Sequence, residues 1–419
     1  MINLFFITYD FSGVRTYTNE LVGYLSKQPG ITVYRIFPET PVYREYTEIR
    51  ESDILNIYIP SIQKGRRSLE KYAARCMDLL DPLMRNKEHL IFHLNNAVHV
   101  KLGLEARKRF GAKLIYTLHF LPNYFSYIDL DRKNQEELTT TGDALEREIT
   151  KEADQIICVT HFARKMLIDV FGCATKKVVA IHNGYGKKEG IAPSSGEQQN
   201  RLKKKFGFSE QEQIILFVGR LERRKGLKHL FGAFNEVSRR NPRVRLILAG
   251  GGYFEETFRD IKSNWGKITI TGKISSAGIA KLYKITTIGI IPSIYEQCSY
   301  VALEMMQQGL PIIVSGAPGL KELFTDGKDA LMVPLHKRTD KLLEPKIHEK
   351  ELAKTLEMML KNNVLRQKLG EQARIRWERY YMREQMGEAT IKLYRKLVTD
   401  NGIENKGIYK KEEGQKVTT

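Results

Sequence analysis

Two glutamates, Glu296 and Glu304, stand eight positions apart in the stretch EQCSYVALE, within an otherwise apolar region. A carboxylate is a good double acceptor for the vicinal hydroxyls of a sugar. Cys298, Ser299 and Tyr300 lie between them, where a helix is expected to begin, and the free amides at a helix N-terminus favour phosphate. The spacing therefore indicates a site for a phosphate-linked sugar. Taken alone, it also fits one loop charge and one surface helix charge.

A basic stretch, LFVGRLERRKGLKHL at 216–230, offers partners for a diphosphate. Arg220 follows a predicted strand, and Lys225 stands just before the next predicted helix. A guanidinium fork and an ammonium point charge can converge on one diphosphate. A basic RNA-binding loop would usually also carry exposed aromatic residues, which this stretch lacks. The remaining basic residues are expected to be solvated, namely Arg223, Arg224 and Lys228.

The N-terminal half holds two further candidates. Gly13 begins a predicted helix after a strand, where the missing side chain lets a ligand approach the backbone. The turn is not GxGxxG, so it gives a dinucleotide site little support. His119 ends another predicted strand, although a lone histidine is more often a packed residue. The DxD pattern at 129–131 follows no convincing strand and is discounted as a metal signal.

The elements that must position these residues alternate between apolar runs of strand length and amphipathic segments of helix length. Continuous Val, Ile and Leu runs are typical of parallel strands covered by helices on both faces. This alternation predicts doubly wound α/β domains. The predicted strands are 2–8, 32–37, 90–94, 113–119, 155–160, 177–183, 214–219, 245–250, 268–272, 288–293 and 311–315.

The chain divides at 184–199, a stretch rich in Gly, Ser, Pro and charge that predicts a linker. We expect Rossmann-like domains at 1–185 and 186–383, with a helix near 384–398 that can pack back on the first. The tail 400–419 lacks periodicity and is expected to be disordered. Ligands bind beyond the carboxyl ends of parallel strands, so the predicted site is a cleft between the facing domains.

Composition limits the partners. The 419 residues carry a formal net charge of +19, which favours an anionic partner or a solvated basic surface. Four cysteines without a CxxC pair favour a reduced compartment. The N-terminus lacks a signal-peptide pattern, and no apolar run reaches the roughly 20 residues that span a bilayer. We expect a cytoplasmic protein, at most peripheral to the inner face of a membrane.

Together these motifs resemble the retaining glycosyltransferases of family 4, also called glycosyl transferases group 1, which have the two-domain GT-B fold. The pair Glu296 and Glu304 matches the family's two glutamates separated by seven residues. Arg220 and Lys225 match its basic pair. The resemblance covers roughly residues 1–390. It also rests on two segments, SGAPGLKELFTDGKDALMVP at 315–334 and IHNGYG at 181–186.

The resemblance implies that Arg220 and Lys225 neutralise the diphosphate of a nucleoside diphosphate sugar. It implies that Glu296 holds the sugar hydroxyls, that Glu304 holds the ribose, and that His119 lies beside the transferred sugar. The remaining donor-binding residues that it implies are Gly13, Gly272, Lys273, Ile274, Cys298, Ser299 and Tyr300. The family usually needs no metal or other cofactor, because the basic pair stabilises the leaving group.

Two departures leave specificity open. Ser12 precedes Gly13 where the family often has two adjacent glycines, and QCS follows Glu296 in place of the family's usual Gly/Pro-Phe-Gly. The acceptor, a saccharide, a lipid-linked glycan or a protein, is expected in the first domain near 64–80 and 121–133, with possible contact to an anionic membrane.

The expected function is transfer of a sugar to an acceptor hydroxyl, in cell-surface polysaccharide or other glycoconjugate synthesis. One alternative is a nucleotide-sugar epimerase of similar architecture. Another is a non-catalytic partner that binds a sugar nucleotide in a glycosylation complex. Nucleic-acid binding is the third, and it predicts a steep salt dependence of affinity.

Overall fold

The computed structural model describes residues 1–8, 12–61, 68–121, 135–187, 196–252, 261, 264–336 and 345–408. Within them the chain forms two compact units. Of the described residues, unit 1 comprises those up to Gly184 together with those from Arg383 onward, and unit 2 comprises those within Tyr185–Met382. The acceptor segment 121–133 therefore lies almost wholly outside the described residues, as does the DxD pattern.

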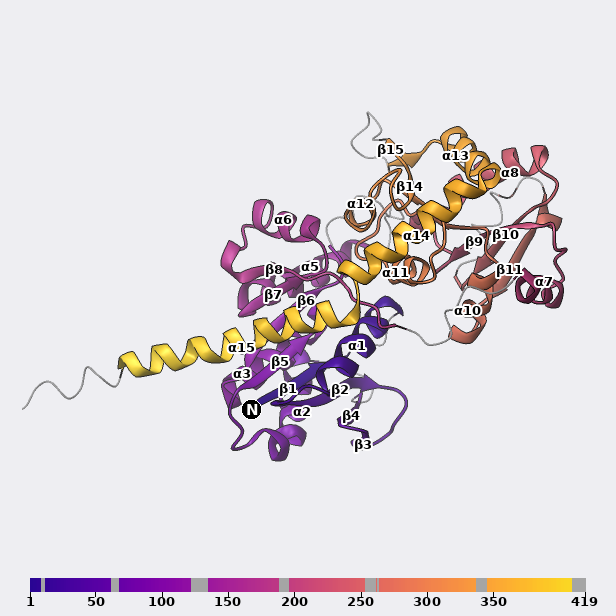
Figure 1. The fold of residues 1–419 in the computed structure, drawn as a ribbon. Coiled ribbons are helices and arrows are strands. Elements are labelled where there is room, and N and C mark those ends of the chain that lie inside the picture. Colours follow the sequence, from indigo (N-terminus) through magenta and orange to yellow (C-terminus); the bar gives the residue numbers. More distant parts are fainter. Residues whose placement is uncertain are drawn as a thin grey trace, which may run out of the picture. The chain divides into compact units, whose positions relative to one another are not determined.

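Unit 1 is built on an eight-stranded sheet of order β3-β4-β2-β1-β5-β6-β7-β8 (Figure 1). Only the β3–β4 pair is antiparallel within this sheet. Because β5 and β1 are buried at every residue, continuous apolar runs identify them in the sequence. The strands are β1 (Ile2–Ile7), β2 (Ile31–Thr40), β3 (Thr47–Glu51), β4 (Ile54–Pro60), β5 (Leu90–Leu94), β6 (Lys113–Leu118), β7 (Gln155–Cys158) and β8 (Val178–Ala180).

Helices connect these strands and begin where the sequence supplies caps. Ser68 and Thr160 each accept a hydrogen bond from a backbone amide in the first turn of α2 and α6, at Lys71 and Ala163 respectively. The helices of unit 1 are α1 (Ser12–Leu25), α2 (Leu69–Met84), α3 (Val100–Phe110), α5 (Gln135–Glu152), α6 (His161–Asp169) and α15 (Arg383–Ile408).

Helix α15 returns the C-terminal part of the chain to unit 1, where it runs beside α1 (Figure 1). Met386 and Thr390 are buried, and Tyr394 is fully buried. The Tyr394 hydroxyl shares a hydrogen bond of 2.5 Å with Nδ1 of His93 on β5. The helix extends to Ile408, beyond its predicted end near residue 398. Residues 409–419 lie outside the described part.

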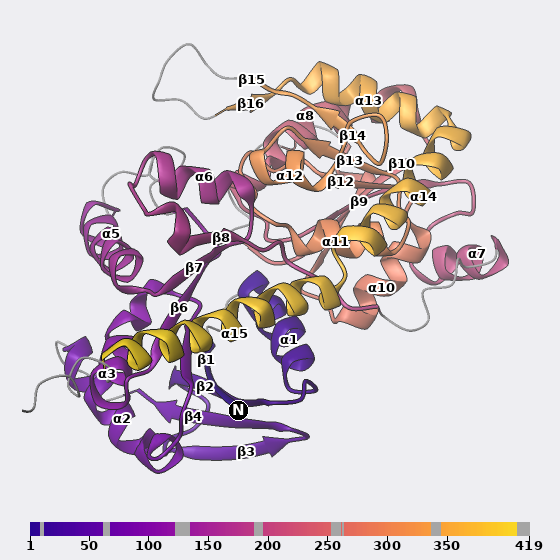
Figure 2. The same cartoon turned by 60° about the vertical axis from the view of Figure 1, so that its left-hand side comes forward.

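Unit 2 has a six-stranded sheet of order β11-β10-β9-β12-β13-β14, in which every pair is parallel (Figure 2). Its strands are β9 (Gln213–Val218), β10 (Val244–Ala249), β11 (Ile268–Gly272), β12 (Ile288–Ile291), β13 (Ile312–Ser315) and β14 (Leu331–Val333). A separate antiparallel hairpin consists of β15 (Leu335–His336) and β16 (Lys346–Ile347). The helices are α7 (Gly196–Lys205), α8 (Leu227–Arg240), α10 (Ser276–Ile285), α11 (Tyr300–Gln307), α12 (Pro318–Leu323), α13 (Glu349–Lys361) and α14 (Asn363–Tyr380).

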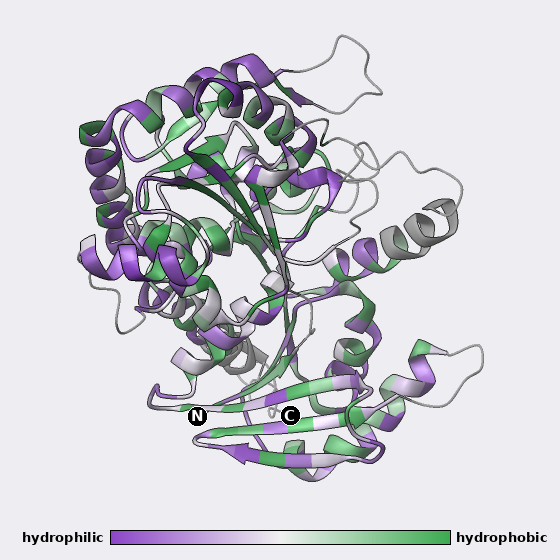
Figure 3. Ribbon diagram, turned by 90° about the vertical axis from the view of Figure 1, so that its right-hand side faces the viewer, coloured by the Kyte–Doolittle hydropathy of each residue, from purple (hydrophilic) through white to green (hydrophobic). Residues whose placement is uncertain are grey.

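The core of unit 2 lies between its sheet and its helices. Its strands are largely hydrophobic, whereas its outer helices carry hydrophilic faces (Figure 3). Helix α13 packs on α8, where Phe231, Phe234 and Leu356 are buried. Burying one such side chain contributes about 1.5–3 kcal/mol. The predicted class of two doubly wound α/β units is therefore confirmed.

The structure also bears on the cysteines and on the question of membrane-spanning helices. All four cysteines are free thiols. Among the described helices, none combines the length and the hydrophobicity that crossing a bilayer requires.

Candidate active site

The strand order of unit 2 reverses between β9 and β12. From β9 the chain moves to β10 and β11 on one side, then returns to β12, β13 and β14 on the other. Because all six strands are parallel, their carboxyl ends share one edge of the sheet. The loops after β9 and β12 diverge at the reversal, and such a switch point forms the ligand crevice of open α/β sheets. Arg220 and Lys225 follow β9, and Glu296 follows β12.

Lys225 and Glu296 meet at this switch point. Nζ of Lys225 lies 2.6 Å from Oε2 of Glu296, and their side chains are 21% and 15% exposed. The Ser293 hydroxyl donates to the same carboxylate oxygen at 3.1 Å. A half-buried, charge-assisted pair of this kind is stronger than a surface ion pair. The structure therefore brings together one residue predicted to bind the diphosphate, Lys225, and one predicted to bind the sugar, Glu296.

Gly226 holds the basic loop against the loop after β12. Its φ is +69°, and a Cβ there would lie 1.9 Å from the carbonyl oxygen of Pro292. The amide of Ile294 also donates to the carbonyl of Arg224 at 2.9 Å. Only glycine combines the left-handed conformation with this close approach. The position of Lys225 therefore depends on the residue that follows it.

Replacing Gly226 with alanine is expected to lower the free energy of unfolding by about 2–4 kcal/mol. The strained φ accounts for about 1–2 kcal/mol and displacement of the Pro292 backbone for the rest. Urea unfolding followed by circular dichroism measures the change. Gly266→Ala is the matched control, since a Cβ at Gly266 meets no atom within 4 Å. Equal unfolding midpoints for the two variants would contradict the assignment.

Arg220 pairs with a residue that the sequence reasoning missed. Its Nη1 lies 3.3 Å from Oε2 of Glu222, and Arg224 contacts the same carboxylate at 3.3 Å. The expectation that Arg224 is solvated is wrong, because its side chain is only 21% exposed. Arg223 and Lys228 are exposed as expected. An acid two positions after Arg220 in the run RLERRK was the available signal for Glu222.

Glu304 lies on α11 and faces α10. The hydroxyl of Tyr283 donates to its Oε2 at 2.7 Å. Burial, together with the neighbouring Glu304 carboxylate, raises the pKa of Tyr283 well above its ordinary value, so this phenol remains a hydrogen-bond donor at neutral pH. Sequence reasoning did not find Tyr283, because it belongs to a different helix, α10.

Helix α11 begins where the sequence predicted. Ser299 is its N-cap, and the hydroxyl accepts a hydrogen bond from the amide of Ala302 at 3.3 Å. Cys298 and Tyr300 on either side are buried. The Ser299 hydroxyl therefore has a structural task, and the proposed contact of this turn with phosphate would come from backbone amides.

The segment 315–334 supports the Glu296 loop. The amide of Gly319, in α12, donates to the carbonyl of Glu296 at 3.2 Å. A Cβ at Gly319 would lie 1.9 Å from the carbonyl oxygen of Gln297. The loop and the helix therefore fit only with glycine at this position. This contact gives a physical reason for a motif that the sequence indicated by resemblance alone.

Three predicted donor-binding residues, Gly272, Lys273 and Ile274, lie at the carboxyl end of β11. The Lys273 side chain packs over Gly251 in the loop after β10, and Ile274 is 37% exposed. The carbonyl of Gly251 in turn accepts the amide of Leu221 at 2.9 Å. Loops after β9, β10 and β11 thus form one continuous set of contacts, which places these residues along the carboxyl edge of the sheet.

Unit 1 contains the two remaining candidates. Gly13 lies in the first turn of α1 and is half-buried. His119 follows β6 and is 8% exposed, with Nε2 3.0 Å from Oδ1 of Asn95. Nδ2 of Asn95 donates to the carbonyl of Ile7 at 2.9 Å, so its Oδ1 is the acceptor. This arrangement assigns the proton of the His119 ring to Nε2.

Burial lowers the pKa of His119 to about 3. The ring is therefore neutral at pH 7, and it cannot serve as a cation toward a diphosphate. With Nε2 committed to Asn95, Nδ1 is the nitrogen that can accept a hydrogen bond.

Comparisons with known proteins agree with this architecture. The model of the glycosyl transferases group 1 matches residues 198–376, and the model of glycosyltransferase family 4 matches residues 11–186. An uncharacterized glycosyltransferase of Methanocaldococcus jannaschii is 32% identical over 184 residues, 43% of this chain and 47% of the relative. A D-inositol 3-phosphate glycosyltransferase of Mycobacteroides abscessus is 26% identical over 246 residues, 57% of this chain and 53% of the relative. The chain thus spans about half the length of these curated relatives.

Solved structures match over more of the chain. Sucrose-phosphate synthase from Thermosynechococcus elongatus superposes with a TM-score of 0.74 at 20% identity, covering 96% of this chain and 100% of that one. HepE of Anabaena, solved in complex with UDP-glucose, gives a TM-score of 0.70 at 14% identity, covering 94% and 100%.

These similarities and the two sheets, one parallel and one parallel except for the β3–β4 pair, define a GT-B fold with two Rossmann-like units. Within that class the chain belongs to the glycosyl transferases group 1. The resemblance of the sequence motifs to this family is thereby confirmed.

Proposed function

We propose that the protein is a retaining glycosyltransferase that moves a sugar from a nucleoside diphosphate sugar to an acceptor hydroxyl. The observation that carries the proposal is the half-buried Lys225–Glu296 pair at the switch point of unit 2. The two curated relatives described above are named as glycosyltransferases, and HepE was solved in complex with UDP-glucose. The same donor class fits a basic loop facing a carboxylate.

In this proposal Lys225 contacts the diphosphate without leaving Glu296. An ammonium has three donors, so one can remain on the carboxylate while others reach phosphate oxygens. Arg220 adds a second positive group from the same loop. Negative charge develops on the leaving diphosphate, and positive groups already in place stabilise it. The proposed role of the basic loop is therefore stabilisation of the departing nucleoside diphosphate.

The two acids take the hydroxyl groups of the donor. Glu296 accepts from the transferred sugar, and Glu304, oriented by Tyr283, accepts from the ribose. Neutral His119 contributes a hydrogen-bond acceptor, and Gly13 leaves the start of α1 open to a ligand. We propose no protein nucleophile, no metal and no cofactor for this reaction. Retention is assigned to attack on the same face that the diphosphate leaves.

A thermal-shift panel of UDP, GDP and ADP and their sugars tests donor binding. A donor at about 100 times its Kd stabilises the folded protein by about 2.7 kcal/mol. Arg220→Ala and Lys225→Ala are expected to lose the shift, whereas Lys228→Ala, on the exposed face of α8, is expected to keep it. If both loop variants are stabilised like the parent, the diphosphate assignment is wrong.

Product analysis with the stabilising donor then tests the reaction. Acceptor-dependent appearance of a glycoside with the donor's anomeric configuration, seen by NMR, supports retaining transfer. Epimerised sugar without transfer would instead support the epimerase alternative. Absence of any turnover, with donor binding intact, would support the non-catalytic partner.

A further inference from the structure

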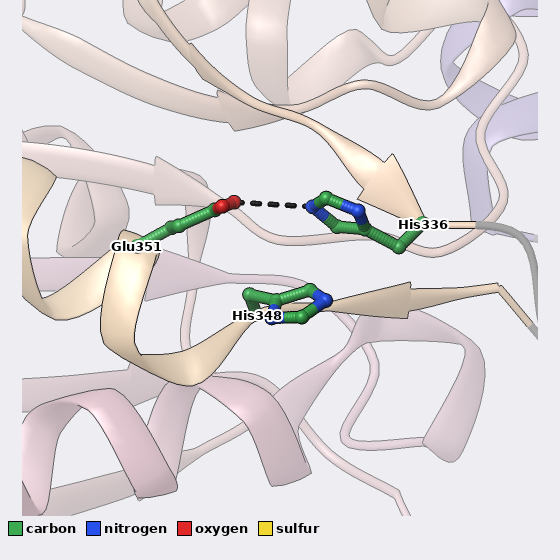
Figure 4. A group of neighbouring side chains, drawn as sticks. All are labelled: His336, His348 and Glu351. Atoms are coloured by element: carbon green, nitrogen blue, oxygen red, sulfur yellow. Dashed lines mark hydrogen bonds and ion pairs between the residues drawn. The ribbon is translucent and has the colours of Figure 1, made fainter.

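A second group of chemically capable side chains lies away from the donor loops, beside the hairpin of β15 and β16. It consists of His336 at the end of β15, His348 directly after β16, and Glu351 in the first turns of α13 (Figure 4). None of the three takes part in the donor site proposed above. We call this group the hairpin cluster.

The register of the hairpin explains why the two histidines meet. Leu335 pairs with Ile347, and His336 pairs with Lys346. Side chains alternate between the two faces of a strand, so His336 shares a face with Lys346 and His348. Leu335 and Ile347 point the other way and pack with the hydrophobic core. The core therefore fixes which face presents the imidazoles.

Helix α13 brings the carboxylate to the same face. Nε2 of His336 lies 3.1 Å from Oε2 of Glu351, and the two histidine rings are 3.9 Å apart between centroids. His348 is the N-cap of α13, yet its side chain makes no capping hydrogen bond. One donor atom from each of the three residues lies within 4.8 Å of the others. The imidazole of His348 is therefore turned toward the cluster instead of the helix end (Figure 4).

We propose that the hairpin cluster binds one divalent transition-metal ion, with Zn²⁺ as the best fit. Two imidazoles and one carboxylate form a common three-ligand zinc set, with water in the fourth position. Bonds of about 2 Å place tetrahedral ligands roughly 3.4 Å apart. The His336–Glu351 distance already meets this value, and small side-chain rotations close the remainder.

The charges around the cluster are compatible with a cation. Glu351 supplies one negative charge. Lys346 lies on the same face but is exposed, so solvent and salt screen its ammonium. The bound ion would join the hairpin to α13, which packs on α8. Its expected effect is therefore structural stabilisation of unit 2, independent of sugar transfer.

The proposal is tested by calorimetric titration with ZnSO₄. The titrated protein is the full chain, free of any affinity tag. The parent is expected to bind one equivalent with a rise in Tm. Co²⁺ is expected to give the intense visible d–d absorption of a tetrahedral site. His348→Ala is expected to weaken binding by about 10²-fold or more, because even changes outside the ligand set cost about 10–100-fold. Glu351→Gln keeps the size of the side chain and is expected to lose the Tm rise.

His182→Ala is the matched control, because the His182 ring packs against His161 elsewhere in the chain. It is expected to retain parental affinity for Zn²⁺. The absence of saturable binding by the parent would overturn the proposal. So would parental affinity in both His348→Ala and Glu351→Gln, since the ion would then bind elsewhere. In those cases the cluster only connects the hairpin to α13 through the hydrogen bond between His336 and Glu351.

Discussion

Replacing Lys225 with alanine is expected to lower kcat/KM for sugar transfer by about 10²–10³-fold. Loss of one group that stabilises developing charge typically has this effect. The substitution also leaves the half-buried Glu296 carboxylate near the proposed diphosphate position without its partner at 2.6 Å. Electrostatic repulsion then adds to the lost attraction. Initial rates at varied donor concentration measure the change.

The pair can be tested as a unit. If Lys225 and Glu296 act together, the double variant Lys225→Ala/Glu296→Gln should lose far less activity than the product of the single losses. Lys228→Ala, which changes an exposed charge on α8, should retain parental kinetics. Multiplicative losses in the double variant, or a loss below about tenfold for Lys225→Ala, would show that the ion pair has no joint role in transfer.

Acid is expected to destabilise unit 1 well before its surface carboxylates are protonated. Burial lowers the pKa of His93 and His119 to about 3 and that of His99 to about 4. The unfolded chain binds these protons near pH 6.5, whereas the folded chain does not. Stability from these residues is therefore complete above about pH 6.5 and falls as the pH is lowered toward the folded pKa values.

The slope has a definite size. For each buried histidine, the free energy of unfolding is expected to fall by about 1.4 kcal/mol per pH unit below about pH 6.5. The loss reaches about 2 kcal/mol at pH 5. Urea unfolding of the full chain at pH 7 and pH 5, with a probe in unit 1, measures the loss. His93→Gln should make the dependence less steep, and the exposed His161→Gln should leave it unchanged. A pH-independent unfolding free energy in the parent would contradict neutral burial.

The sequence predicted the buried parallel strands well, because burial on both faces leaves an uninterrupted apolar run. Strand β5 matches its predicted bounds, and β11 does as well. Strands β3 and β4 were missed. The run TEIRE of β3 is mostly charged because it forms an edge, and Asn56 interrupts β4. The order of strands depends on long-range packing, so the switch point could not be predicted from periodicity.

The residues of the candidate site, like the strands, were predicted only in part. Motif spacing identified Lys225 and Glu296, and the structure places them in contact. Glu222 and Tyr283 were missed because their relevance comes from partners, Arg220 and Glu304, and neither residue belongs to a recognisable motif. A sequence window reports which residues are near along the chain. It reports poorly on which side chains will orient a ligand from another helix.

The return of α15 to unit 1 determines the order in which the chain can mature during synthesis. The described residues of unit 2 lie in one continuous segment, Tyr185–Met382, so all of them are synthesised before α15. Until α15 is synthesised, unit 1 lacks the helix that packs beside α1 and supplies Tyr394 to His93. Domains normally fold in the order of translation. Here the half that is translated first is the one that finishes last, and until then its exposed apolar surface is the part of the nascent chain most in need of a chaperone.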